Sequence, residues 1–218
     1  MELHEALYTT RAMRRVKKDP IPEDVQMRIL DAAVRAPSGG NAQSWRFLLL
    51  DSPEIKSQLG PLYRDGLNRV FDSAYKKPLE AAEADPEAAQ SVKFQKMYRS
   101  AIWLSDHFED YPLMLFAFSR GDTTGASIYP AVWSAMLAAR AEGVGTAITS
   151  VLLYHHEEML KILGVPADKG WNFSCTVTMG YPTGRWGVAP RRPANEVAYR
   201  NRWGQPVGFE IPDPLWPE

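Results

Sequence analysis

The sequence predicts an α+β protein, and three observations support this. Segments with helical periodicity and short apolar strand-like runs are intermixed along the chain at very different spacings. The 218 residues contain no internal repeat and no linker-like stretch that would divide them. Hydrophobic residues make up 45% and charged residues 23%, which is typical of a globular chain that buries its own core. We therefore expect a single domain over residues 1–218.

Helices are predicted where apolar residues recur every three or four positions. Val25, Ile29 and Ala33 follow this spacing, just after a proline that favours a helix start. The segment 127–141 is apolar nearly all round, so it is expected to be a helix that is buried on all sides. The predicted helices are 2–9, 23–36, 53 to about 63, 127–141 and 156–163.

Strands are predicted at short apolar or alternating runs that are bounded by turn residues. They are 45–50, 113–119, 146–152 and 173–179. Residues 61–110 show weak apolar periodicity and many Ala and Glu, which indicates an insertion or lid of exposed helices. The tail from about 198 to 218 is rich in Pro and Trp and too apolar to be disordered. It is predicted to be an extension that covers a surface, such as that of a second subunit.

The charge balance and composition exclude several classes of partner. There are 25 basic and 26 acidic residues, so no global field favours nucleic acid or an anionic membrane. The apolar run 113–118 is far shorter than the roughly 20 residues that span a bilayer. The first residues lack the apolar core of a signal peptide, and the single cysteine excludes an internal disulfide. We expect a cytoplasmic protein with no nucleic-acid or membrane partner.

Two arginine clusters are candidates for binding an anion. Arg11, Arg14 and Arg15 stand at i, i+3 and i+4, so their guanidinium groups can converge on one phosphate. The alternative is a solvated basic helix end, which the helix dipole favours. Arg191 and Arg192 are flanked by rigid prolines that would preorganise them, although in isolation the segment is better explained as a charged surface loop.

A third polar segment, 37–45, precedes the first predicted strand. Its two adjacent glycines allow a backbone to approach a ligand closely, and Ser38, Asn41 and Gln43 supply polar groups. The alternative is an ordinary helix C-cap and turn. No His, Cys, Asp or Glu spacing in the chain matches a metal site or a nucleophilic triad. We therefore predict no metal ligand and no catalytic side chain.

In this order, the three segments resemble the nitroreductase family of flavoproteins. The family pattern Arg-x-Ser-x-Arg-x-Phe stands here as Arg-Ala-Met-Arg-Arg-Val at 11–16, followed by a proline turn. The family signature Pro-Ser-x-x-Asn-x-Gln-Pro-Trp stands as Pro-Ser-Gly-Gly-Asn-Ala-Gln-Ser-Trp at 37–45. Gly-Val-Gly-Thr at 143–146 and Met-Gly-Tyr-Pro at 179–182 are also similar to family elements. Ala12, Val16 and Ser44 depart from the family residues Ser, Phe and Pro.

The resemblance implies a mixed sheet flanked by helices, an intertwined homodimer and FMN bound at its interface. It implies electron transfer from NADH or NADPH to a small-molecule acceptor such as a nitroaromatic or quinone, with the chemistry carried by the flavin. Two alternatives are an FMN-binding protein without turnover and another flavin chemistry on the same fold, such as reductive dehalogenation or flavin breakdown.

The resemblance also implies a set of cofactor-binding residues. These are Arg11, Ala12, Met13 and Arg14 around the phosphate and ribityl chain; Pro37, Ser38, Gly39 and Asn41 from the other subunit; Thr149, Ser150, Val151 and Leu152 as backbone donors near the flavin N5 and O4; and Arg191 at the phosphate.

Overall fold

The computed structural model describes residues 1–211 and 215–216. The chain forms two compact units. One unit consists of residues 12–184, and the other combines residues 1–11 with the described part of 185–218. The larger unit contains the sheet and every helix from α2 to α7.

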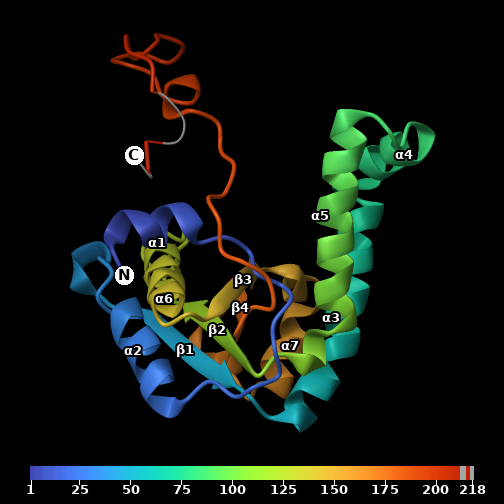
Figure 1. Ribbon diagram of the computed structural model, residues 1–218. Helices are drawn as coiled ribbons and strands as arrows, with labels where there is room; N and C mark the ends of the chain where they lie inside the picture. The colour runs from blue at the N-terminus through green and yellow to red at the C-terminus, as the bar shows by residue number, and fades with distance from the viewer. Residues whose placement is uncertain (212–214, 217–218) are drawn as a thin grey trace. The chain divides into compact units, whose positions relative to one another are not determined.

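Four antiparallel strands form the sheet in the order β1-β2-β4-β3 (Figure 1). They are β1 (Trp45–Leu50), β2 (Leu113–Ser119), β3 (Gly145–Thr149) and β4 (Asn172–Gly180). An additional backbone segment lies along the outer edge of β3, where Ala12 and Thr146 form a parallel bridge and Met13 N donates to Thr146 O at 2.8 Å. The predicted α+β class is confirmed. The four strands are all antiparallel rather than mixed, and the parallel Ala12–Thr146 pairing is an isolated bridge outside them.

Helices cover both faces of the sheet (Figure 1). α2 (Glu23–Ala33) and α6 (Ile128–Ala141) pack on one face, and α3 (Pro53–Asp72), α7 (His156–Ile162) and the end of α5 (Ala89–Asp106) pack on the other. The side chains of β4 alternate accordingly, with Cys175 and Val177 directed to the first face. Burial raises the pKa of the Cys175 thiol to about 12, as expected of a small core residue.

The predicted end of the third helix is wrong. α3 continues past residue 63 to Asp72, because Leu67 and Phe71 extend the buried face that Leu59 and Tyr63 begin. The predicted insertion or lid, 61–110, consists of the second half of α3, α4 (Lys76–Ala84), α5 and a 3-10 turn at Phe108–Asp110.

Two further predictions need correction. β3 ends at Thr149 rather than at 152, because the Thr149 hydroxyl accepts a hydrogen bond from Val151 N at 3.4 Å and the chain turns there into a 3-10 segment, Val151–His155. Within the single chain, α6 is not buried on all sides. Tyr129 and Trp133 are 45% and 40% exposed on it, whereas the opposite side of the helix is buried.

The smaller unit joins the two ends of the chain. It contains α1 (Leu3–Thr9), whose Tyr8 O accepts a hydrogen bond from Ala189 N at 3.1 Å. The rings of Tyr8 and Trp216 also lie 5.7 Å apart. The predicted extension at 198–218 has little regular structure where it is described, namely a bridge between Tyr199 and Pro206. Residues 212–214 and 217–218 of this extension lie outside the described residues.

Candidate functional site

The backbone segment that begins at Ala12 packs against two glycines of the sheet. Gly145 and Gly180 are register partners across β3 and β4. A Cβ on Gly145 would lie 2.8 Å from Met13 Cβ, and a Cβ on Gly180 would lie 2.7 Å from Val16 Cγ2. Only glycine at these two positions allows the segment to pack this closely against the sheet. Arg14 is thereby held at the edge of β3.

The Arg14 side chain is half-buried. Its Nη1 donates to Ser100 Oγ at 3.2 Å, and no carboxylate forms an ion pair with it in the described part of the chain. A permanent cation without a carboxylate partner is typical of an anion-binding site. Arg14 lines a cavity of about 320 Å³, together with Val16, Lys18, Trp103, His107, Asp110 and Tyr111.

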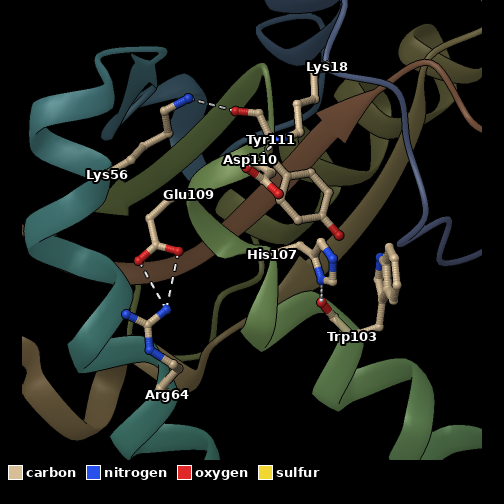
Figure 2. Close-up of polar contacts among 8 residues, drawn as sticks. All are labelled: Lys18, Lys56, Arg64, Trp103, His107, Glu109, Asp110 and Tyr111. Carbon is tan, nitrogen blue, oxygen red and sulfur yellow. Dashed lines mark hydrogen bonds and ion pairs between the residues drawn. The ribbon is translucent and has the colours of Figure 1, made fainter.

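Tyr111 fixes the main chain at Arg14. Its ring is buried, and its hydroxyl donates to the Arg14 carbonyl at 2.5 Å. Lys56 of α3 in turn donates from Nζ to the Tyr111 carbonyl at 2.8 Å (Figure 2). Burial lowers the pKa of Lys56, and burial raises the pKa of Tyr111 so that its phenol stays neutral. The position of Arg14 is therefore set by a buried hydroxyl.

The residues that precede Tyr111 join the end of α5 to α3. Glu109 pairs with Arg64 of α3 at 3.0 Å, and His107 Nδ1 lies 2.9 Å from Trp103 O (Figure 2). The His107 and Trp103 rings stack at 3.7 Å, and the Arg15 guanidinium lies 4.7 Å from the Trp103 centroid. Because His107 and Arg15 both pack on Trp103, this ring forms a fixed wall of the Arg14 cavity.

The turn after β3 contains backbone N–H groups with no acceptor among the described residues. Tyr63 OH lies 3.0 Å from Thr149 Oγ1, which also accepts from Val151 N. The N–H groups of Ser150 and Leu152 have no acceptor among the described residues. Burial raises the pKa of Tyr63 to about 12, against a smaller opposing effect from the Arg14 charge. This turn and the Arg14 segment thus both lie next to Tyr63.

The 37–41 segment packs against a different part of the larger unit. Gly39 N donates to Ser127 Oγ at 3.3 Å at the start of α6, and Ser38 Oγ accepts from Gln43 N at 3.1 Å. The segment lines a cavity of about 480 Å³ beside Arg120. A Cβ on Gly39 would meet nothing within 4 Å. Packing within this chain therefore gives no reason for glycine at position 39, and the space beside it is open.

The sequence profile of the nitroreductase family matches residues 7–181. The chain belongs to the nitroreductase family. The resemblance seen in the arginine, Pro-Ser-Gly-Gly-Asn and glycine motifs is thus confirmed at the level of the family.

Relatives within the nitroreductase family carry different names. The chain is 30% identical to 5,6-dimethylbenzimidazole synthase of Rhodospirillum rubrum over 79% of this chain and 78% of that protein. It is 25% identical to iodotyrosine deiodinase of Thermotoga neapolitana over 91% and 96%. The crystal structure of an oxidized iodotyrosine deiodinase bound to FMN and 3-iodo-L-tyrosine superposes with a TM-score of 0.72 at 22% identity, covering 92% of this chain and 99% of that one. That structural likeness supports the nitroreductase fold.

The residues suggested by the family resemblance are only partly brought together. Ala12, Met13 and Arg14 lie beside the β3 edge that leads into the turn 149–152, whereas the 37–41 segment lies at the start of α6. Arg11 and Arg191 are exposed in the smaller unit, where Arg191 Nη1 donates to Pro190 O at 2.9 Å.

The described residues contain no helix long and apolar enough to cross a membrane. They also contain no cluster of three His, Cys, Asp or Glu that could hold a metal ion.

Sequence reasoning missed three supporting residues. Tyr63, Tyr111 and Lys56 carry no local motif, and their roles depend on contacts between segments far apart in the chain. Gly145 and Gly180 do stand in motifs, but the sequence shows them only as the ends of elements. The sequence did contain one signal for this role. The second glycine of Gly-Val-Gly-Thr is the first residue of a strand, and a glycine in a strand often marks a place where another backbone segment packs closely.

Proposed function

We propose that this protein binds FMN and acts as an oxidoreductase, transferring electrons from NADH or NADPH to an electron-poor acceptor such as a nitroaromatic or a quinone. The observation that carries the proposal is the placement of Arg14 beside the turn 149–152. Among the described residues, Arg14 has no carboxylate partner, and the N–H groups of Ser150 and Leu152 have no acceptor. A guanidinium and neutral backbone donors on one edge suit a ligand with a phosphate and a polar heterocycle.

Each segment has a defined role in this proposal. Arg14 binds the phosphate, assisted by Arg11 and Arg191, and Ala12 and Met13 lie along the ribityl chain. The turn Thr149–Leu152 orients the ring through its backbone donors. Pro37, Ser38, Gly39 and Asn41 of a second copy complete the site, which fits the open space beside Gly39. FMN, when bound, supplies the redox chemistry, so the chain has only to bind, orient and exclude water.

Purified protein is expected to be yellow and to release FMN rather than FAD on denaturation. The reason is that the proposed cation set is suited to one terminal phosphate and the sequence contains no dinucleotide loop. Chromatography of the released flavin is the measurement, and recovery of FAD would contradict the proposal.

A second experiment separates an enzyme from a protein that only stores FMN. If the protein is an enzyme, NADH or NADPH should bleach the bound flavin in the absence of air.

A second candidate is another flavin chemistry on the same fold. It is favoured by the relatives that match most of this chain, which are named 5,6-dimethylbenzimidazole synthase and iodotyrosine deiodinase. An acceptor panel that includes a nitroaromatic, a quinone and 3-iodo-L-tyrosine, together with an assay for 5,6-dimethylbenzimidazole, distinguishes them. Fast turnover of the iodotyrosine alone would replace the leading candidate by reductive dehalogenation.

Arg14→Ala is expected to weaken FMN binding by roughly 10- to 100-fold. The variant removes one charge-assisted contact, which is worth about 1.5–3 kcal/mol. Fluorescence titration of the apoprotein with FMN measures the change. Arg35→Ala is the matched control, because Arg35 is exposed on the surface after α2 and pairs with Asp31. An unchanged dissociation constant for Arg14→Ala would assign this arginine to an ordinary solvated surface.

A further inference from the structure

One face of α3 is shaped to hold the turn that follows β3. Tyr63 and Gly66 lie three residues apart and therefore on the same side of the helix. Tyr63 reaches the Thr149 hydroxyl at 3.0 Å, and a Cβ on Gly66 would lie 2.8 Å from the Val151 carbonyl oxygen. The absence of a side chain at position 66 thus lets α3 approach the backbone of this turn directly.

Tyr63 is itself fixed in place. Its ring is buried and stacks on Phe108 with centroids 4.5 Å apart and planes inclined by 21°. Its phenol stays protonated at neutral pH, since burial raises its pKa to about 12. The hydroxyl is therefore available to donate to Thr149 Oγ1. The Thr149 oxygen also accepts a hydrogen bond from Val151 N. The Thr149 hydroxyl thus bonds to Tyr63 of α3 and to the Val151 backbone N–H, and so joins α3 to the turn.

A second tether lies further along the same two elements. Asp65 Oδ2 is 2.6 Å from His155 Nε2, and Asp65 also pairs with Arg69 at 2.7 Å. The hydrogen bond with His155 is the main reason that the pKa of Asp65 is lowered. The turn is therefore held at both ends, by Tyr63 at Thr149 and by Asp65 at His155.

We propose that Tyr63 is a positioning residue for the flavin: through the Thr149 hydroxyl it sets the direction of the free backbone N–H groups at Ser150 and Leu152. The inference rests on the proposed function, in which this turn faces the flavin. It adds that α3, which carries none of the proposed flavin-binding residues, controls the polarity at the flavin ring. Since these donors stabilise the negative charge that reduction places on the ring, losing their alignment lowers the flavin midpoint potential.

The test compares the wild type with Tyr63→Phe in the full-length FMN-bound protein. We expect Tyr63→Phe to change the flavin absorption spectrum, to lower the midpoint potential and to weaken FMN affinity by roughly 3- to 10-fold. Tyr75→Phe is the control, because Tyr75 lies just beyond α3 and its ring contacts the rings of Phe71 and Phe94. In FMN-free protein, hydrogen exchange at the Val151 amide should be faster in Tyr63→Phe and unchanged in Tyr75→Phe.

A second variant covers the case in which Tyr63→Phe does not fold. Gly66→Ala displaces the Val151 carbonyl without removing any hydroxyl, and the same spectral change and lower potential are expected. If the wild type binds FMN while either folded variant keeps the wild-type spectrum and potential, the positioning role is overturned and the proposed function stands. If the wild type binds no FMN, the proposed function is overturned, and the inference with it.

Discussion

Phe108→Ala is expected to lower the free energy of unfolding by about 3–5 kcal/mol, the usual cost of truncating a fully buried aromatic side chain. Phe108 has no exposed surface and stacks on Tyr63. It lies in the 3-10 turn between α5 and β2, beneath α3 and next to Met114 and Phe116 of the core. The residues around it belong to several elements, so the cavity left by the ring cannot close without moving one of them. Urea denaturation monitored by circular dichroism measures the loss in the free energy of unfolding.

Phe209→Ala is the control for this prediction. Phe209 is 54% exposed in the smaller unit, so its truncation is expected to change stability by less than about 0.5 kcal/mol. Both variants are compared with the wild type at one protein concentration, because assembly contributes to apparent stability. A loss below about 1 kcal/mol for Phe108→Ala would show that the turn relaxes into the cavity, and that Tyr63 does not depend on it.

The elements with a clear apolar pattern were predictable from the sequence. The strands 45–50 and 113–119 have the observed bounds, and the strand 173–179 differs by one residue at each end. The end of α3 was not predictable, since Gly60, Pro61 and Gly66 interrupt the pattern that Leu67 and Phe71 resume. A Cβ on Gly60 would overlap the Glu109 carboxylate, so a larger residue there would force that side chain to move. The helix survives these residues because packing outweighs propensity.

In the site, too, the residues in local motifs were predictable, whereas the residues that hold them in place were not. The motif at 11–16 points to an anion site, and the structure places its Arg14 at the edge of the sheet, with no carboxylate partner in the described part of the chain. What holds Arg14 and the turn 149–152 could not be predicted. Tyr111 reaches Arg14 across 97 residues, and Tyr63 reaches Thr149 across 86. Such contacts follow from the order of the strands, which no local pattern in the sequence specifies.

The exposed side of α6 leads to the last prediction, which concerns assembly. Tyr129 and Trp133 are one helical turn apart and leave a large apolar area uncovered. Tyr129 lines a cavity of about 410 Å³ together with Leu153, which is 47% exposed. A second copy that covers this side would also bring its 37–41 segment, which begins near the start of α6, to the interface. We propose that the protein is an obligate homodimer and that neither copy alone has a complete FMN site.

Trp133→Glu is therefore expected to abolish both dimerisation and FMN retention. A carboxylate without a partner in the covered interface costs several kcal/mol, and each dimer contains two copies of the change. Light scattering over a dilution series, with flavin absorbance recorded in parallel, should show a colourless 24.5 kDa species for this variant. Val92→Glu, which places the same charge on the exposed side of α5, should remain dimeric and yellow. A yellow 24.5 kDa species of the wild type at any concentration would contradict the shared site, because one copy would then suffice to hold the flavin.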